Sequence, residues 1–330
     1  MLVSFAISTY KQEKTIQKAV KAALEQDYSP LEIVISDDCS PDSTWDVINA
    51  AVTGYEGPHK VVLNRNARNL GCVQNLEKIE SLCNGELIVY SEGDDWSLVD
   101  RVSTIMSLYR KHPEVSLIAS NVVRVDSSGI PIEVGHRVEH RAGPDDIEVI
   151  ERGVAPFLCS GRMLSGATFA YPRSLSKHFT TQLDGRWSAD FNLTVRALIL
   201  GPIMIIKRPL INYRVSGGVS TTPSTSIEDS VRINQGRRRV LEQVLADLEC
   251  SEDKVDARLA ACYVRKKIEE IDLYIAFATE ERYLARIWAA FKLCAAYGFS
   301  VRSLMILGLS VLPRRMRNFL YVRRGSRHST

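Results

Sequence analysis

Two short stretches of sequence decide the fold: LEIVISDDCSPD at residues 31–42 and LIVYSEGDDW at residues 87–96. Each begins with an apolar run of the length of a buried strand and then reaches a pair of adjacent aspartates. When such runs alternate with helices, the strands form a mostly parallel sheet, and ligands bind in the crevice outside the carboxyl ends of those strands. We therefore expect both acidic pairs, Asp37–Asp38 and Asp94–Asp95, to lie at that edge of the sheet.

The rest of the chain extends this alternating pattern. Expected strands cover residues 2–8, 31–36, 60–64, 86–91 and 115–125, and expected helices cover residues 13–25, 41–52, 71–83 and 97–111. Further along, the pattern predicts a strand at 163–171, a helix at 188–200 and a strand at 203–213 that Pro209 interrupts. Ser97 is placed to cap the helix that follows it. These elements predict an α/β fold with a mixed, mostly parallel sheet flanked by helices.

From residue 227 onward the pattern is helical almost to the end of the chain. The domain boundary is therefore placed between an α/β domain, residues 1–226, and an α-helical region, residues 227–330. Residues 216–226 are rich in Gly, Ser and Thr, which predicts a mobile loop, placed where it could close over the crevice as a lid.

Composition is ordinary for a globular protein, with 45% hydrophobic and 25% charged residues. The seven cysteines are scattered and form no CxxC motif, so we expect reduced thiols in a cytosolic protein. The amino terminus runs directly into the first strand pattern without a basic leader, which argues against a signal peptide. No apolar stretch reaches the roughly 18 residues that a membrane-spanning helix needs.

Charge is unevenly distributed along the chain. Residues 282–330 contain ten Lys or Arg and no Asp or Glu, although the whole chain carries a net charge of only +3. Apolar and aromatic residues alternate with these basic residues, which is typical of a helix lying on an anionic membrane surface. The alternatives are a helix pair packed on the α/β domain with its basic face solvated, or a nucleic-acid surface. Because no nucleic-acid motif accompanies the charge, we expect no nucleic-acid partner.

The two acidic pairs suggest different chemistry. Asp94 and Asp95 follow a strand directly, and because Ser97 can cap the next helix, both acids are available as ligands. Hard carboxylate oxygens suit Mg²⁺ or Mn²⁺ carrying a substrate diphosphate. Asp37 and Asp38 either form a turn and a helix cap or accept hydrogen bonds from a nucleobase or ribose. A Rossmann dinucleotide site is disfavoured because no GxGxxG follows the first strand.

The ordered set of motifs resembles the family 2 glycosyltransferases, which have the GT-A fold of nucleotide-diphospho-sugar transferases. The set consists of residues 7–13, residues 29–44, the RNLG segment at 68–71 with Asn75, and the run from residue 85 to residue 95. The resemblance is strong over about residues 2–125 and weaker over residues 160–221.

The resemblance implies a site for a nucleotide-diphosphate sugar. Six residues would surround the nucleotide: Thr9, Glu13, Asp37, Asp38, Arg68 and Asn69. Asp95 would be the direct ligand of Mg²⁺ or Mn²⁺, and Asp94 would lie nearer the ribose or donor sugar. Two departures are present: the family's Pro-x-Tyr-Asn is here the segment 8–11, Ser-Thr-Tyr-Lys, and the first acid of the second motif is Glu92. Neither departure removes a carboxylate that the chemistry needs.

The general base is also implied by the resemblance. Inverting transfer needs a group that takes the proton of the acceptor hydroxyl, and in similar enzymes this is an acid that opens a late helix. The segment 187–191, Trp-Ser-Ala-Asp-Phe, fits this pattern, with Ala189 where a Glu often stands. Asp190 is therefore the implied base. The alternative is that Asp190 only interacts with the dipole of its own helix.

Arg214 resembles the Arg of the family's Tyr-Arg-x-His segment, in which Ser216 here replaces the His. A guanidinium can make bidentate contacts with the oxygens of a leaving diphosphate, so Arg214 is an implied donor ligand. The alternative is that Arg214 is an ordinary surface cation.

The activity implied by the resemblance is inverting transfer of a sugar from a nucleotide-diphosphate donor to an acceptor hydroxyl. The implied acceptor is a lipid-linked glycan of a bacterial surface polysaccharide such as O-antigen, assembled at the cytoplasmic face of the membrane by a peripheral enzyme. Two alternatives belong to other classes. A nucleotidyltransferase would normally show a basic, Gly-rich loop after the first strand, and this chain has none there. A silent sugar-nucleotide-binding or scaffold protein would typically have lost the metal acids or the base.

Overall fold

The computed structural model describes residues 1–132, 146–179, 189–215 and 226–279, together with the single residues 287, 290 and 292. Two predicted features fall largely outside these ranges: the loop at 216–226, of which only residue 226 is described, and the basic segment 282–330.

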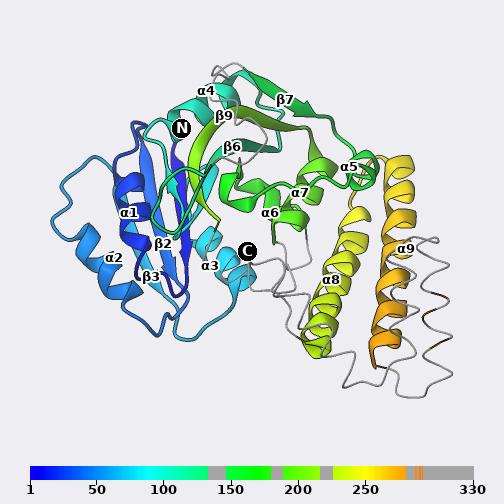
Figure 1. The fold of residues 1–330 in the computed structure, drawn as a ribbon. Helices are drawn as coiled ribbons and strands as arrows, with labels where there is room; N and C mark the ends of the chain where they lie inside the picture. The colour runs from blue at the N-terminus through cyan, green and yellow to red at the C-terminus, as the bar shows by residue number, and fades with distance from the viewer. Residues whose placement is uncertain are drawn as a thin grey trace.

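One sheet forms the centre of the described fold (Figure 1). Its strands are β1 (Val3–Thr9), β2 (Leu31–Asp37), β3 (Lys60–Arg65), β4 (Leu87–Glu92), β5 (Trp96–Ser97), β6 (Leu117–Val125), β7 (Ile147–Ile150), β8 (Ala170–Pro172) and β9 (Ile203–Arg214). The order is β3-β2-β1-β4-β8-β6-β9-β5, and β7 pairs with β9. Strands β1 to β4 are parallel, as are β6 and β9, whereas β8 runs antiparallel between them. The carboxyl ends of β1, β2 and β4 therefore lie side by side.

Helices cover both faces of the sheet. They are α1 (Ile16–Leu24), α2 (Thr44–Val52), α3 (Cys72–Leu82), α4 (Arg101–Lys111), α5 (Val154–Ser160), α6 (Ser174–Lys177), α7 (Ala189–Leu200), α8 (Ile227–Leu248) and α9 (Lys254–Thr279). Apolar side chains of α1, α2 and α4 pack with one face of the sheet, and those of α3, α5 and α7 pack with the other. Every residue of β2 is buried, as expected of a central parallel strand.

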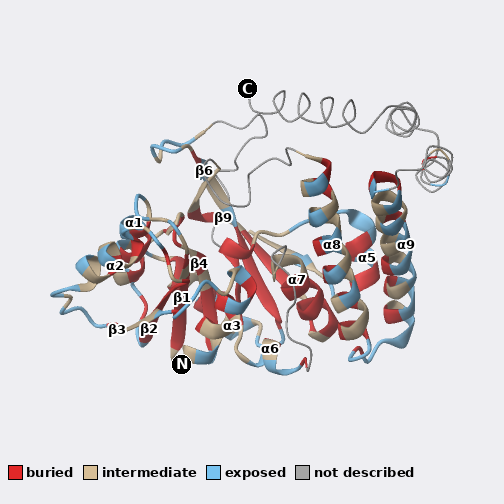
Figure 2. Cartoon of the chain, turned by 90° about the horizontal axis from the view of Figure 1, so that it is seen from below, coloured by how far each residue is buried: buried red, intermediate tan, exposed pale blue. Residues whose placement is uncertain are grey.

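The long helices α8 and α9 lie beside the second face and pack against each other (Figures 1 and 2). Helix α8 begins where the sequence placed a boundary, and the Ser226 Oγ caps it by accepting a hydrogen bond from Asp229 N at 3.0 Å. Val244 of α8 and Val264 of α9 belong to the same buried cluster as the second face of the sheet. The hydrophobic core is thus continuous across residue 226. None of the helices in the described part of the chain is long and apolar enough to span a bilayer.

Three local predictions are wrong. Ser97 does not cap a helix, because residues 96–97 form β5, which pairs with β9, and α4 begins only at Arg101. The strand expected at 163–171 is a single turn of 3₁₀ helix (Gly166–Thr168) followed by the short β8. Pro209 does not interrupt β9, because a register shift against β6 accommodates it.

A buried carboxylate ties the amino-terminal edge of the sheet together. Glu32 on β2 accepts hydrogen bonds from Ser4 Oγ at 2.6 Å, from Gly85 N at 3.2 Å and from both nitrogens of Asn84. Burial alone would raise the pKa of Glu32, but these hydrogen bonds hold it below its usual value. The charged form of Glu32 therefore stabilises the entry of the chain into β4.

We predict that Glu32→Ala lowers the free energy of unfolding by about 3 kcal/mol, because it leaves several buried donors without an acceptor. Urea denaturation at neutral pH measures this loss, and the exposed Glu56→Ala is the matched control, expected within about 0.5 kcal/mol of the native chain.

The contribution of Glu32 to stability depends on pH in a defined way. Since the pKa of Glu32 is depressed on folding, its contribution is present at neutral pH and is lost as the pH falls through the folded-state pKa. The stability difference between the native chain and Glu32→Gln should therefore shrink under acid conditions. A difference that stays constant down to about pH 3 would contradict the assignment.

Candidate active site

Three carboxylates converge just beyond the end of β4. Glu92 is the last residue of that strand, and Asp94 and Asp95 follow in the turn that leads into β5. One oxygen from each of the three side chains lies within 4.8 Å of the others, so a single cation could contact all three. The sequence analysis identified Asp94 and Asp95 as metal ligands, and the structure adds Glu92 to this acidic cluster.

The acidic cluster is electrostatically unfavourable by itself. Burial and the charge of Asp94 raise the pKa of Asp95 to about 7, and burial followed by the charges of Asp94, Asp190 and Asp95 raises the pKa of Glu92 well above its usual value. Asp94 Oδ1 and Asp95 Oδ2 are buried and have no hydrogen-bond partner in the described residues. Unpaired oxygens of this kind fit a hard divalent cation, which takes carboxylate oxygens as ligands.

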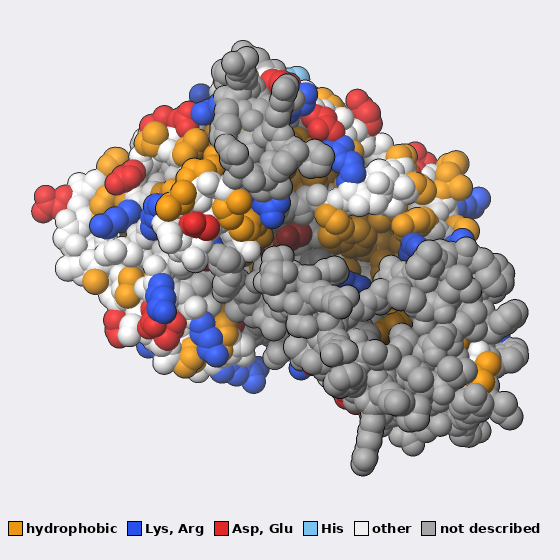
Figure 3. Space-filling view, viewed as in Figure 1, with side chains coloured by type: hydrophobic (Ala, Val, Ile, Leu, Met, Phe, Trp, Pro, Cys, Tyr) orange, Lys and Arg blue, Asp and Glu red, His pale blue; other side chains and the backbone are white. Residues whose placement is uncertain are grey.

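Asp190 lies in the first turn of α7 and faces the acidic cluster closely enough for its charge to affect Glu92. Its Oδ2 accepts a hydrogen bond from the backbone N–H of Gly166 at 2.9 Å, and burial raises its pKa. A Cβ atom at residue 166 would collide with the carboxylate of Asp190, so the close approach of the backbone requires glycine. Figure 3 shows acidic side chains in a recess near the centre of the molecular face, with hydrophobic surface on one side.

Arg214, at the end of β9, contacts the turn that carries the acidic cluster. Its backbone N–H donates to Asp95 Oδ1 at 2.8 Å, and its Nε donates to the backbone oxygen of Asp94 at 3.3 Å. Its Nη1 donates to the backbone oxygens of Asp126 and Ser127 in the turn after β6. In this arrangement the guanidinium joins two loops at the site, and its contact with a diphosphate stays a prediction.

Arg101 is a site residue that the sequence analysis missed. Its side chain is fully buried and donates to Ser97 Oγ at 2.9 Å and to the backbone oxygens of Tyr90 at 2.8 Å and Ala167 at 3.0 Å. Its charge also opposes the rise in the pKa of Asp95. An arginine at the start of an amphipathic helix normally indicates a solvated surface, so no pattern in the sequence indicates this burial.

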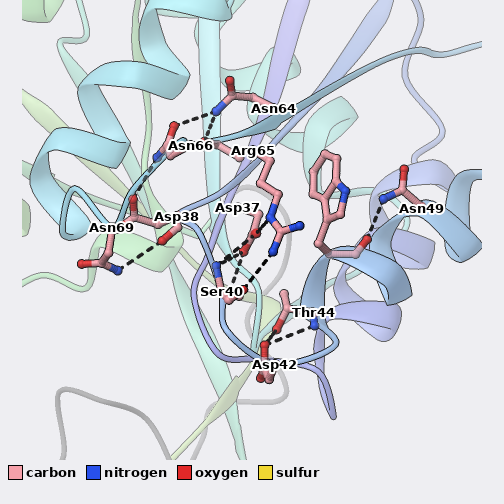
Figure 4. Close-up of polar contacts among 12 residues, drawn as sticks. Asp37, Asp38, Ser40, Asp42, Thr44, Asn49, Asn64, Arg65, Asn66 and Asn69 are labelled. Atoms are coloured by element: carbon pink, nitrogen blue, oxygen red, sulfur yellow. Dashed lines mark hydrogen bonds and ion pairs between the residues drawn. The ribbon is translucent and has the colours of Figure 1, made fainter.

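Asp37 and Asp38 point in different directions at the carboxyl end of β2 (Figure 4). Asp37 is fully buried, accepts hydrogen bonds from the backbone N–H and the hydroxyl of Ser40, and forms an ion pair with Arg65 Nε at 3.3 Å. Arg65 also lies over the ring of Trp45, with its guanidinium carbon 5.8 Å from the centroid. These contacts support the interpretation that Asp37 forms a turn. Its contact with a nucleotide stays a prediction.

Asp38 anchors the loop that contains the RNLG segment. Its Oδ1 accepts from Leu70 N at 2.8 Å and from Asn66 Nδ2 at 2.9 Å, and its Oδ2 accepts from Gly71 N at 2.8 Å. The buried Asn75 extends this network, since it accepts from Asn66 at 2.9 Å and donates to Ser8 Oγ at 2.8 Å. Asp38 therefore shapes the loop in front of the sheet through contacts within the protein.

The remaining predicted nucleotide residues lie on the same edge. Thr9, at the end of β1, donates to Gln12 Oε1 at 2.7 Å, and Glu13 accepts from Ser43 N at 3.1 Å. Asn69 donates to the backbone oxygen of Asp38 at 3.2 Å, and Arg68 is exposed beside it. Thr9 thus ends β1, Glu13 lies in the loop after β1, and Arg68 and Asn69 lie in the loop after β3, while their contacts with a nucleotide stay a prediction.

The fold defines the class of protein. The mixed, mostly parallel sheet flanked by helices is a GT-A-like fold. The structure of *S. aureus* TarS residues 1–349 in complex with UDP-GlcNAc is similar over 99% of this chain and 91% of that one, with a TM-score of 0.58 and 15% sequence identity. The fold predicted from the sequence is confirmed.

The sequence of the first half of the chain matches a known family. Residues 4–164 match Glycosyl transferase family 2. The match includes the acidic pairs at 37–38 and 94–95 and ends before α7.

Several curated relatives are named as bacterial glycosyltransferases. The abequosyltransferase RfbV of *Salmonella typhimurium* is 28% identical over 178 residues, which are 53% of this chain and 52% of that protein. The UDP-Glc:alpha-D-GlcNAc-diphosphoundecaprenol beta-1,3-glucosyltransferase WfaP of *Escherichia coli* is 30% identical over 102 residues, 31% of this chain and 39% of that protein. The chain thus spans about half or less of the length of these relatives.

Proposed function

We propose that the chain is an inverting glycosyltransferase that moves a sugar from a nucleotide-diphosphate donor to the hydroxyl of a lipid-linked glycan. The observation that carries this proposal is the juxtaposition of the acidic cluster after β4 with Asp190 on α7. The acidic cluster suits a metal-bound diphosphate, and Asp190 suits a proton transfer. Both lie on the same side of the sheet. The match of residues 4–164 to a glycosyltransferase family supports this reading.

The donor lies along the carboxyl edge of β1 to β4 in this proposal. Thr9, Glu13, Asp37, Asp38, Arg68 and Asn69 surround the nucleoside, either directly or by shaping its loops. Asp95 and Asp94, with Glu92 beside them, hold Mg²⁺ or Mn²⁺, and Arg214 fixes the turn that carries them. When bound, the metal supplies Lewis-acid stabilisation of the leaving diphosphate.

Asp190 is the general base. It accepts the proton of the acceptor hydroxyl as that oxygen attacks the anomeric carbon from the face opposite the diphosphate, which inverts the configuration. The N–H of Gly166 orients the carboxylate by donating to Asp190 Oδ2. Burial raises the pKa of Asp190, which makes the carboxylate a stronger proton acceptor than an exposed aspartate.

The proposed acceptor is a glycan on a lipid diphosphate in bacterial surface polysaccharide assembly. The name of WfaP specifies a diphosphoundecaprenol acceptor, and that of a *Campylobacter jejuni* relative specifies a PP-undecaprenol one. An acceptor of this kind is held in a membrane, so we place the protein at the inner face of the cell membrane as a peripheral enzyme.

We predict that Asp190→Asn lowers the rate of sugar transfer by about 10²–10⁴-fold, because the amide cannot take the acceptor proton. Donor affinity should change by less than about twofold, since the proposed donor residues are untouched. Transfer is followed with radiolabelled nucleotide sugar and a membrane extract as the acceptor, and donor binding by calorimetry.

The matched control is Asp46→Asn, because Asp46 also stands in the first turn of a helix, α2, but on the exposed surface. It should retain full activity. Equal activity of Asp190→Asn and Asp46→Asn would mean that Asp190 only interacts with the dipole of its own helix and that the general base lies elsewhere.

The basic segment 282–330 is proposed to bind the anionic lipid surface. We predict that replacing Arg314, Arg315, Arg317, Arg323 and Arg324 by Gln releases the full-length chain from anionic vesicles in a flotation assay, while neutral vesicles bind neither form. Undiminished flotation of the variant with anionic vesicles would assign the segment to packing within the protein.

A further inference from the structure

Helix α7, which carries Asp190, is enclosed on all sides. Every residue from Asn192 to Ile199 is buried, polar residues included. The sheet lies on one side of α7, and α8 packs on another. Most of α7 is therefore coloured as buried in Figure 2. A helix that is buried all round depends on its neighbours for its position.

A buried ion pair connects α7 with α8. Arg196 Nε and Nη2 donate to the two oxygens of Asp247, at 2.7 and 3.1 Å, and the two side chains are 3% and 0% exposed. Gln243 Nε2 also donates to Asp247 Oδ1 at 3.0 Å, and the guanidinium lies over the ring of Phe179, 4.8 Å from its centroid. Such a pair adds little net stability compared with an apolar contact of the same volume. Its bidentate geometry instead fixes the position and orientation of one helix relative to the other.

The charge of Arg196 also reaches α3. Burial raises the pKa of Glu80 on α3, while a hydrogen bond from Tyr171 Oη at 2.6 Å and the charge of Arg196 act against that rise. The first residue of α3, Cys72, lies near enough to Asp190 for the charge of Asp190 to contribute to its raised pKa, after burial and Glu92.

Helix α9 contacts the start of α5, the helix that precedes Gly166 in the chain. The carboxylate of Asp256 accepts hydrogen bonds from Val154 N at 2.7 Å and Ala155 N at 3.0 Å, at the start of α5. The chain leaves α5 and reaches Gly166, whose N–H holds Asp190. Asp247 of α8 thus holds α7, and Asp256 of α9 holds the start of α5.

We propose that Arg196 and Asp247 are positioning residues through which the helical region holds α7, and with it Asp190, in place for proton transfer. The inference rests on the proposed function, because it takes Asp190 as the base. It gives α8 a role in positioning α7 through Asp247, and neither Arg196 nor Asp247 is placed against the substrate.

The test is Asp247→Asn in the full-length chain, a change that keeps the volume of the side chain and removes its charge. We expect kcat to fall at least tenfold, with the KM for the donor changed by less than twofold, because α7 moves and the donor loops do not. Hydrogen exchange of the peptide covering 189–196 should become faster, and that of the peptides from β1 and β2 should not change. Arg196→Lys keeps the positive charge but loses the bidentate contact with the two oxygens of Asp247. Its kcat should lie between that of the native chain and that of Asp247→Asn.

The matched control is Val264→Ala, which removes buried apolar volume from α9 and leaves the ion pair intact. It should lower the midpoint of thermal unfolding without changing kcat at a temperature where the chain is folded. An equal fall in kcat for the control, or an unchanged kcat and unchanged exchange in Asp247→Asn, overturns the proposal.

Two further outcomes are separable. If Asp247→Asn does not fold, Arg196→Lys takes its place, and a native kcat in that variant then overturns the proposal. If the native chain transfers no sugar to any acceptor, the proposed function fails, whereas the exchange of 189–196 still decides whether the ion pair positions α7.

Discussion

Electrostatic repulsion among Glu92, Asp94, Asp95 and Asp190 is the constraint on which the rest of the site depends. Four carboxylates gather at one edge of a sheet, and burial raises the pKa of each of them. For Glu92 and Asp95 the charges of neighbouring carboxylates raise the pKa further. The protein supplies only part of the compensation, through Arg101 behind Asp95 and the backbone N–H groups of Arg214 and Gly166. The buried carboxylates therefore lower the stability of the fold locally, and a bound cation with its diphosphate would compensate their charge.

The loops around the acidic cluster are held by polar contacts within the protein. Asp38 fixes the RNLG loop, Asp37 fixes the turn before α2, and Arg214 fixes the turn at Asp94. Each of these side chains was a candidate ligand, and each has protein partners in the described structure. The site is consequently shaped before a donor arrives, which reduces the ordering that binding requires.

The sequence predicted the sheet, its flanking helices and the position of the acids because these follow from local rules. Alternating apolar runs determine strands and helices, and carboxylates after parallel strands must meet at one edge. The errors arose where tertiary contacts override local preference. Ser97 joins β5 because β9 offers a partner strand, and β8 is short because it fits antiparallel between β4 and β6.

Contacts between residues far apart in sequence could not be predicted at all. The burial of Arg101, the Arg196–Asp247 pair and the cap that Asp256 provides to α5 join residues separated by about fifty to one hundred positions. In the sequence these are charged residues in amphipathic helices, which usually face solvent. They become informative only once the fold shows what they touch.

The most direct test of the central claim, that the acidic cluster binds a metal together with a sugar nucleotide, is calorimetric. UDP-, GDP-, dTDP- and CMP-sugars would each be titrated into the full-length chain with and without Mn²⁺, and into Asp95→Ala. We expect one nucleotide class to bind at least tenfold more tightly with Mn²⁺, and the gain to disappear in the variant. Binding that is independent of metal, an equal gain in Asp95→Ala, or no binding by any member of the panel would contradict the account.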